Sequence, residues 1–291
     1  MQVNPIIEKE LKIKMRGWKA PALITVYLGF LGLIVLLFFM VNNEQARYTL
    51  QFTPSVAVST FNTLAIFQLI LILAITPALT AGSISGEKER QTLDLLLCTN
   101  LSTYKIVIGK IVVSIAHVIL LITASLPILG TVFLYGGIGL TDILALFGFY
   151  IVTAFMAASM GIFYSTIFRK SAVAIIVTYI TLLAMVFGTV VLLVLWIYLF
   201  RVSAIYNLST NTIMAFLFAN PFFGFGSVIG NSSASNSLLA IFNLSTYGST
   251  SGFFSSWLKP WVLNVTFDII ISAVFIFLSA MRLKPVKRRR A

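Results

Sequence analysis

Six long apolar segments alternate with shorter polar segments along the chain. The first, residues 22–41, carries no charged residue and has about the ~20 residues that a helix needs to cross ~30 Å of hydrocarbon. The pattern therefore predicts an all-α, polytopic membrane protein in which residues 1–291 form a single transmembrane domain. The six predicted transmembrane helices are 22–41, 56–81, 111–134, 143–168, 171–200 and 261–281.

The fourth predicted helix carries small residues that are spaced four apart. These are Ala154 and Ala158 and, on an offset row, Ala157 and Gly161. Small residues at this spacing let two membrane helices approach closely, so we expect this helix to pack within the bundle. The fifth helix, 171–200, is longer than one straight crossing requires, which predicts that it tilts or projects beyond the bilayer.

Residues 1–19 show a second kind of pattern, that of an amphipathic helix. Apolar residues recur at helical spacing, at Val3, Ile7, Leu11, Met15 and Trp18. The charged residues of this segment fall mostly on other faces. A basic amphipathic helix that ends in Trp is typical of one lying in the headgroup plane. The alternative is a solvated helical lead-in that only anchors the first transmembrane helix.

Residues 82–110 form the one sizeable charged segment between two long apolar blocks. Ser85 is a candidate N-cap, and Glu87 and Glu89 would lie in the first turn, where negative charge suits the helix dipole. Arg90 follows Glu87 at a spacing of three, within side-chain reach on a helix. The apolar stripe consists of Leu93, Leu96 and Leu97.

This pattern predicts a short cytoplasmic helix within residues 84–104 that has one charged face and one leucine-rich face. Because its two ends continue into the second and third transmembrane helices, such an element could transmit a push to both. An ordinary interfacial loop helix is the alternative that periodicity alone leaves open.

Composition supports the membrane interpretation and narrows the chemistry. The chain is 59% hydrophobic and 10% charged, where soluble domains usually carry about 25% charged residues. A mean hydropathy of +1.02 excludes a soluble core of this size. Cys98 is the only cysteine, which excludes an intramolecular disulfide and a cysteine metal cluster. Residues 1–19 are too charged and too periodic for a cleavable signal peptide, so we expect none.

The positive charge is concentrated at the ends of apolar segments. A net charge of +12 is compatible with nucleic-acid binding, but this placement is that of a membrane protein, and we predict no nucleic-acid partner. Of the 20 basic residues, all but Arg47, Arg201 and Lys259 fall on one side of the predicted topology. The positive-inside rule therefore places both termini and residues 84–104 in the cytoplasm, and residues 201–259 outside.

One ionisable residue lies within a predicted transmembrane helix. Asp268 follows Asn264 by four positions in the sixth helix, so the two side chains share a face. An ionisable residue at membrane depth is a functional candidate by default, here at a transport pathway or a subunit interface. The alternative is a carboxylate near the outer leaflet that pairs with Lys259 or Arg201.

Two further polar residues lie alone in long apolar helices. Gln68 is a candidate for the same pathway or interface, although such residues more often form a hydrogen bond between helices. His117 has no second histidine or carboxylate at metal-binding spacing. The sequence therefore predicts no metal site. The lack of a Ser/His or His/Glu cluster predicts no catalytic residue and disfavours a membrane-embedded enzyme.

The run EKERQTLDLLLCTNLSTYKIVIGK at residues 87–110 resembles the signature segment of ABC-2 type transporter permeases. The matching positions are Thr92, Leu93, Asp94, Leu96, Leu97, Gly109 and Lys110. NPIIEKELKIKMRGWK at residues 4–19 and the run Asn220-Pro221-Phe222 are also similar to these permeases, and the resemblance extends over the whole chain. Asn100 departs from the family, which typically has proline there.

The resemblance implies a permease subunit of an ATP-driven ABC exporter in the plasma membrane, which we expect to be prokaryotic. In this family, separate cytoplasmic ATPase subunits bind ATP and Mg²⁺ and move a coupling helix, here about 87–97, while residues 1–19 form a connecting helix. Two permease chains, identical or homologous, form the pathway as a dimer. The implied coupling residues are Glu87, Lys88, Glu89, Arg90, Thr92, Leu93, Asp94, Leu96 and Leu97.

The chain itself carries no GxxxxGK[ST] phosphate loop, so we expect no nucleotide site, no cofactor and no enzymatic activity on it. The alternative function is that of an ion-coupled secondary transporter or channel subunit, which would depend on Asp268, Asn264 and Gln68. That alternative calls for more buried charge and more broken helices at the midplane than the sequence indicates. The sequence does not indicate which substrate is transported.

Overall fold

The computed structural model describes residues 17–49, 54–93, 103–133, 139–199, 210–229 and 260–283, and their regular structure is entirely helical. Several predicted features lie outside these ranges: the N-terminal helix up to residue 16, Asp94, Leu96, Leu97, Asn100, most of 201–259 and the basic tail. The described helices are α2 (Lys19–Thr49), α3 (Pro54–Thr80), α4 (Ser85–Glu89), α6 (Thr103–Ala124), α7 (Leu126–Phe133), α8 (Leu140–Ile167), α9 (Ser171–Leu183), α10 (Thr189–Leu199), α11 (Thr210–Leu217), α12 (Pro221–Ile229) and α15 (Pro260–Arg282).

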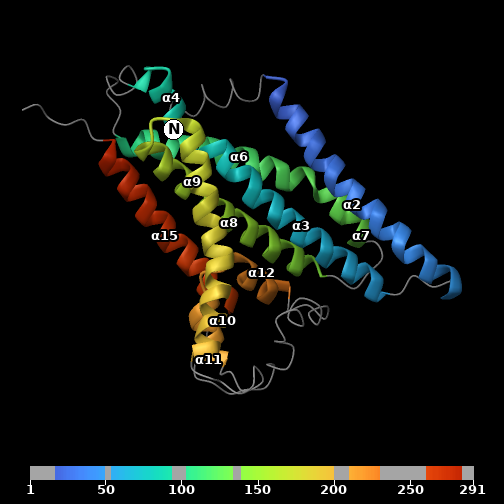
Figure 1. Ribbon diagram of the computed structural model, residues 1–291. Coiled ribbons are helices and arrows are strands. Elements are labelled where there is room, and N and C mark those ends of the chain that lie inside the picture. Colours follow the sequence, from blue (N-terminus) through green and yellow to red (C-terminus); the bar gives the residue numbers. More distant parts are fainter. Residues whose placement is uncertain are drawn as a thin grey trace, which may run out of the picture.

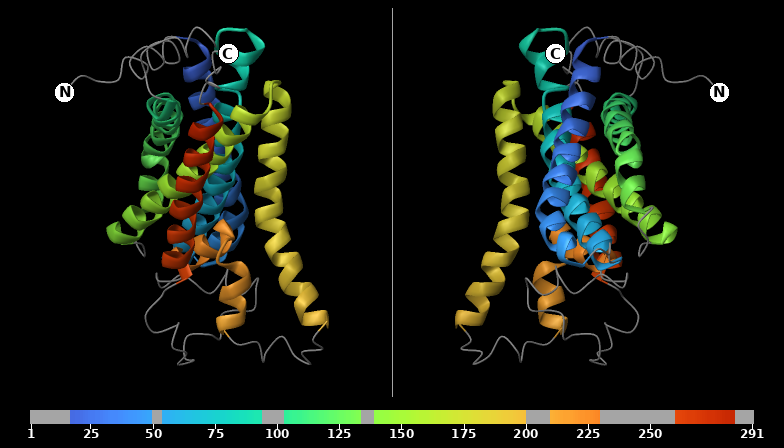
Figure 2. Two further views of the ribbon diagram at one scale, coloured as in Figure 1. Left: turned by 90° about the vertical axis from the view of Figure 1, so that its left-hand side faces the viewer. Right: turned by 90° about the vertical axis from the view of Figure 1, so that its right-hand side faces the viewer.

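Six helical stretches in the described part of the chain are long and apolar enough to cross a membrane, which confirms the predicted all-α membrane fold. They are built on α2, α3, α6 with α7, α8, α9 with α10, and α15, and they run roughly alongside one another (Figure 1). The views in Figure 2 place α9 and α10 at one edge of the bundle and α6 and α7 at the opposite edge.

The fourth transmembrane helix, α8, forms the centre of the bundle. It packs against α3, α6, α9, α12 and α15, and it is buried along most of its length. The small residues predicted to allow close approach are Ala154, Ala157, Ala158 and Gly161, and all are buried. A Cβ atom on Gly161 would collide with the side chain of Thr80 in α3, so only glycine permits this approach. Tyr150 ties the same two helices, because its hydroxyl donates to the Ala65 carbonyl at 2.7 Å.

The third transmembrane helix begins earlier than predicted and is not continuous. It starts at Thr103 rather than at residue 111, so Lys110 is part of α6 and is buried. Its first helix ends at Ala124, and α7 begins at Leu126. The interruption occurs where Pro127 has no backbone N–H with which to continue the hydrogen-bond ladder of α6.

The fifth transmembrane helix contains a π-helical segment, Ala184–Gly188, between α9 and α10. Such segments leave carbonyl groups without their usual α-helical partners, and they occur often at functional sites. Here the Asn220 side chain donates from Nδ2 to the Val186 carbonyl at 2.8 Å and to the Thr189 hydroxyl at 3.0 Å. The turn before α12 therefore contacts the fifth helix directly.

Helices α11 and α12 are the described part of the predicted outer segment 201–259. Asn220 caps α12, because its Oδ1 accepts the Phe222 N–H at 3.0 Å and Pro221 occupies the first helical position. Phe225 stacks on Tyr150 with ring centroids 6.3 Å apart, which seats α12 against α8. The end of the bundle opposite α4 is thus closed in part by α12 (Figure 1).

Candidate functional site

Helix α4 lies beyond the end of α3, at the end of the bundle where α8 ends and α9 begins (Figure 1). Its first turn is anchored by Ile84, which is fully buried. Ile84 belongs to an apolar cluster that joins three other segments: α6 through Val107 and Ile111, α8 through Ile162, and the end of α15 through Leu283. Leu93, which follows α4, packs partly against the same cluster. α4 is therefore seated on the bundle rather than held only by its flanking chain.

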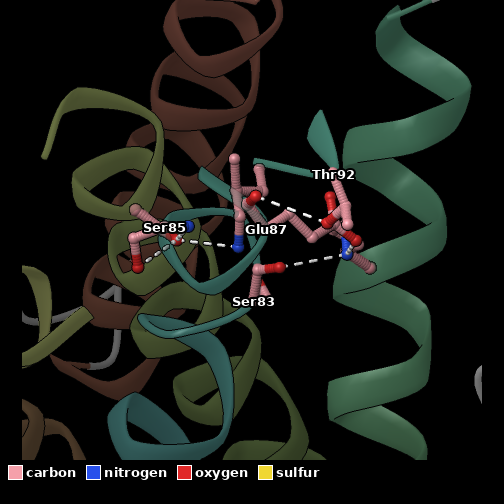
Figure 3. Close-up of polar contacts among 7 residues, drawn as sticks. Ser83, Ser85, Glu87 and Thr92 are labelled. Carbon is pink, nitrogen blue, oxygen red and sulfur yellow. Dashed lines mark hydrogen bonds and ion pairs between the residues drawn. The ribbon is translucent and has the colours of Figure 1, made fainter. Parts of the chain in front are cut away.

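The N-terminus of α4 is capped by a residue from another helix. The Ser165 hydroxyl oxygen in α8 accepts the backbone N–H groups of Ile84 at 2.9 Å and Ser85 at 2.7 Å. Ser85 is thus not the N-cap that the sequence suggests. It is the first residue of α4, and its hydroxyl donates back to the Ala81 carbonyl at 3.0 Å. Figure 3 shows Ser85 in this set of contacts.

Glu87 forms an ion pair with Lys110 of α6. The Lys110 Nζ lies 2.8 Å from the Glu87 Oε1 and also donates to the Ser83 carbonyl at 3.1 Å (Figure 3). The Lys110 side chain is 3% exposed and that of Glu87 is 23% exposed. Glu87 therefore pairs across helices rather than with Arg90 three positions along, and it fixes α4 to the start of the third transmembrane helix.

Lys88 reaches the C-terminal end of α8. Its Nζ donates to the carbonyl of Thr166 and lies 3.5 Å from the carbonyl of Ser165. The last carbonyls of a helix lack partners within that helix and carry partial negative charge, so a cation is favoured there.

Glu89 reaches the N-terminal end of α9. Its two carboxylate oxygens accept hydrogen bonds from the Ser171 backbone N–H at 3.0 Å and from the Ser171 hydroxyl at 2.7 Å. These hydrogen bonds lower the pKa of the Glu89 carboxyl, which lies outside the bundle, so it is charged at neutral pH. An anion at a helix N-terminus also complements the dipole. Consecutive residues of α4 thus match the polarity of the two helix ends that they contact.

The end of α4 is defined by a left-handed residue. Gln91 has φ of 56°, its N–H bonds to the Lys88 carbonyl at 3.2 Å, and the Thr92 N–H bonds to the Glu87 carbonyl at 2.9 Å. This is the Schellman pattern, in which glycine usually occupies the left-handed position. The helix predicted over 87–97 is therefore interrupted at Gln91. Beyond it, Thr92 is exposed, and Asp94, Leu96 and Leu97 lie outside the described residues.

A hollow of about 650 Å³ opens beside the end of α4. Its lining residues come from both sides of the contact: Lys88, Gln91 and Leu93 from α4 and the residues after it, and Ile167 and Arg169 from the end of α8. The wall therefore combines two cationic side chains with two aliphatic ones. Arg90, which precedes the lining residue Gln91 in the chain, is exposed.

The intramembrane candidates lie elsewhere in the fold. Asn264 and Asp268 share the buried face of α15, as their spacing predicts, and both are fully buried. Asn264 donates from Nδ2 to the carbonyls of Phe218 at 2.8 Å and Asn220 at 3.2 Å. Among the described residues, neither carboxylate oxygen of Asp268 has a hydrogen-bond partner. The alternative partners of Asp268, Lys259 and Arg201, are outside the described ranges.

Gln68 and His117 form local contacts. Gln68 donates from Nε2 to the Ser125 hydroxyl at 2.8 Å, which links α3 to the junction between α6 and α7. The His117 Nδ1 lies 3.0 Å from the Val113 carbonyl in its own helix. Over the part of the chain that the structure describes, no group of three or more histidine, cysteine or acidic residues is placed to hold a metal ion.

Sequence reasoning missed two residues of this site, Ser165 and Ser171. Ser165 is in the last turn of the fourth transmembrane helix, and Ser171 is the first residue of the fifth. The available signal was their position beside the Arg169–Lys170 turn, which the charge count places on the same side of the membrane as α4. Two residues on the same side of the membrane need not touch each other. The contacts of Ser165 and Ser171 with α4 are evident only from the way α4 packs in the structure.

Comparison with known proteins gives one match to the chain as a whole. A family model described as ABC-2 family transporter protein matches residues 5–283. No curated protein matches the chain. The matched residues include α4 and every described transmembrane helix.

Proposed function

Since the chain belongs to the ABC-2 transporter family, we propose that it is the permease subunit of an ATP-driven exporter whose ATPase subunits are separate cytoplasmic chains. The family match and the six-helix membrane fold support a permease of an ABC transporter. Export, coupling at α4 and assembly with a second permease chain are the further parts of the proposal. ATP and Mg²⁺ would be bound by the ATPase partner.

The contacts of α4 are the observation that carries this proposal. Glu87, Lys88 and Glu89 connect this five-residue helix to α6, α8 and α9, and the chain itself connects it to α3. A displacement of α4 would therefore act on four transmembrane helices at once. An interfacial loop helix without a mechanical role does not require such connections. We infer that α4 receives the motion of the ATPase and passes it to the bundle.

The same contacts revise the roles expected for the individual charged residues. Glu87, Lys88 and Glu89 serve inside the chain, as the joints that hold α4. Of the described residues of the expected coupling set, Glu89, Arg90 and Thr92 are exposed, and Glu89 is already bonded to Ser171, which leaves Arg90 and Thr92. In this proposal they contact the ATPase, and the three joints transmit the force.

A second permease chain, identical or homologous, completes the pathway in this proposal. The fifth transmembrane helix has an outward face on which a partner or lipid can lie, since the buried residues described for α9 are Ala174, Thr178 and Leu182 and none is described for α10. Asp268 and Asn264 are fully enclosed in the single chain. They would enter the pathway only if α15 moves relative to α8.

Asp268 also favours the second candidate function, an ion-coupled secondary transporter. A buried carboxylate without a hydrogen-bond partner among the described residues is a group to which a proton or cation could bind. The family assignment opposes this function, because ABC-2 permeases work with an ATPase. The two functions differ in their energy source, which an experiment can determine.

The test is purification of the full chain, tagged at one end, from the cells that naturally contain it. We expect an ATPase subunit to copurify in a fixed ratio and the complex to hydrolyse ATP. The Glu87→Arg variant should retain the ATPase subunit while losing ATP-dependent transport, because the joint to α6 is broken. A chain that purifies without any ATPase, and that moves an ion down its gradient in proteoliposomes, would overturn the proposal in favour of the second candidate.

A further inference from the structure

We infer that residues 168–170, the turn between α8 and α9, form one docking surface with Arg90 and Gln91, and that this surface receives an acidic segment of the cytoplasmic ATPase. This inference rests on the proposed function and adds to it a second contact element and the chemistry of the partner. The family signature at residues 87–110 contains no part of this turn.

The first support is that the turn is fastened to α4 on both of its sides. Before the turn, Lys88 donates to the Thr166 carbonyl. After it, Ser171 donates to Glu89 through both its backbone N–H and its hydroxyl. The Ser85 and Ser171 hydroxyls also lie 3.3 Å apart. A partner that binds the end of α4 thus meets the turn in a fixed position beside it.

The second support is the sign of the outward charge. Of the two carboxylates of α4, Glu87 pairs with Lys110, while the exposed Glu89 accepts hydrogen bonds from Ser171 and keeps its negative charge. Among the described residues, the exposed cationic side chains at this corner are Arg90, Arg169 and Lys170, and they outnumber the exposed carboxylate of Glu89. A surface of this sign attracts an acidic partner, and the attraction depends on ionic strength.

The third support is the hollow between the two elements. Lys88 and Arg169 place positive charge in its wall, while Leu93 and Ile167 provide an apolar side. A volume of about 650 Å³ is enough for more than one side chain of a partner. The arrangement fits a segment in which a carboxylate side chain adjoins an apolar one. An anionic lipid headgroup offers the same charge, and the experiment must distinguish it.

The test uses the full chain with the ATPase that copurifies with it. In the variant R169E/K170E we expect the retained ATPase to fall at least tenfold at low salt, with a smaller loss for R169Q. The matched control is Arg282→Glu, which reverses an exposed cation at the same end of the bundle, on α15. It should retain the ATPase fully. Photocrosslinking from position 169 should identify an acidic segment of the ATPase, and a Glu→Lys or Asp→Lys change there should restore binding to R169E/K170E.

The outcomes separate the two claims. If the unaltered chain retains no ATPase, the proposed function fails, and this inference fails with it. If the unaltered chain and R169E/K170E retain equal amounts, the docking surface is wrong while the proposed function stands. The surface is also wrong if Arg282→Glu loses as much ATPase as R169E/K170E does. It is wrong as well if R169E/K170E, reconstituted into vesicles, keeps its ATPase and loses only bound phosphatidylglycerol, because these residues then bind the membrane rather than the ATPase.

Discussion

The two polar regions of this molecule differ in how their buried groups are satisfied. At the α4 end of the bundle, Lys110 is paired with Glu87, and the Ile84 and Ser85 N–H groups bond to Ser165. On α15, Asp268 is equally buried, but neither of its carboxylate oxygens has a hydrogen-bond partner among the described residues. In the first region the buried charges are paired, although Glu87 Oε2 and the Ser83 hydroxyl have no partner among the described residues. In the second region the buried carboxylate itself has none.

Completed and incomplete contacts have different physical uses. Buried polar groups that are fully satisfied hold a single arrangement, because any movement leaves a donor or acceptor without a partner. This property suits a joint that must transmit displacement without yielding. A buried carboxylate without a partner is instead stabilised when a movement of the helices brings a proton, a cation or water to it. Such a group suits a position that changes state during a transport cycle. The α4 end should therefore be sensitive to loss of a polar group, and the Asp268 position should not.

The largest expected effect is from breaking the Glu87–Lys110 pair. Glu87→Ala removes the anionic partner of the buried Lys110 ammonium, and removal of one partner from a buried pair costs about 3–5 kcal/mol. We expect a large fall in the thermal unfolding temperature of the purified chain in detergent. Lys110→Met combined with Glu87→Gln should recover much of the loss. Equal stability of the single and double variants would show that the pair is not coupled.

A smaller loss is expected from Ser165→Ala, because the N–H groups of Ile84 and Ser85 then lose their acceptor. Each unsatisfied buried group costs about 1–3 kcal/mol, although water that enters the site can reduce the cost. The matched control is Ser279→Ala, since the Ser279 hydroxyl is buried and donates only to Phe275 in its own helix. Thermal unfolding of the two variants should differ clearly. Similar values for both would mean that α4 finds another cap.

A modest gain is expected from Gln91→Gly. A residue other than glycine in the left-handed region carries a cost of roughly 1–2 kcal/mol that glycine avoids, part of which is offset by the greater entropy of glycine in the unfolded chain. The neighbouring Arg90 has φ of −83°, so Arg90→Gly should destabilise instead. The opposite signs are measurable as shifts in unfolding temperature. A loss for Gln91→Gly would indicate that the glutamine side chain itself holds the turn.

The transmembrane part of the fold follows closely from sequence, because each span is determined by local composition. Apolar length predicts the six spans, and the small residues of the fourth predict that it packs closely within the bundle. Lys110 shows where this reasoning fails. A lysine beside an apolar run reads as the end of a span, yet in the structure it lies inside α6 because Glu87 and Ser83 satisfy its charge there.

The sequence predicts that a short helix exists at α4, but it does not predict which residues of other helices α4 contacts. Spacing along one helix relates Glu87 to Arg90, whereas its partner Lys110 is 23 positions away, and Ser171 is 82 positions from Glu89. Such contacts depend on how separate helices pack. The same applies to the π-helical segment at Ala184–Gly188, whose Val186 carbonyl is satisfied by Asn220 from a distant turn. Helix propensity and spacing along one segment therefore predict neither the partners of α4 nor the π-helical segment.

The smallest expected effect on stability is that of Asp268→Asn, and it tests the comparison most directly. The substitution keeps the shape of the side chain and removes a carboxyl that has no described partner, so we expect unfolding to shift by less than about 0.5 kcal/mol. If Asp268 changes state during transport, ATP-dependent transport should nevertheless fall. Unchanged transport would show that the residue is only a polar group on the buried face of α15.

The reciprocal variant, Asn264→Asp, provides the matched control one helical turn away. The Asn264 amide donates to the carbonyls of Phe218 and Asn220, and a carboxylate there would face both with acceptors only. We expect a loss of about 2 kcal/mol or more from the two unsatisfied carbonyls and their repulsion. The same atom exchange, made in opposite directions on the same buried face, should therefore be nearly neutral at one position and costly at the other. Equal costs at both positions would mean that Asp268 is held by a partner as firmly as Asn264 is, and the contacts of Asp268 would then be complete like those of the α4 end.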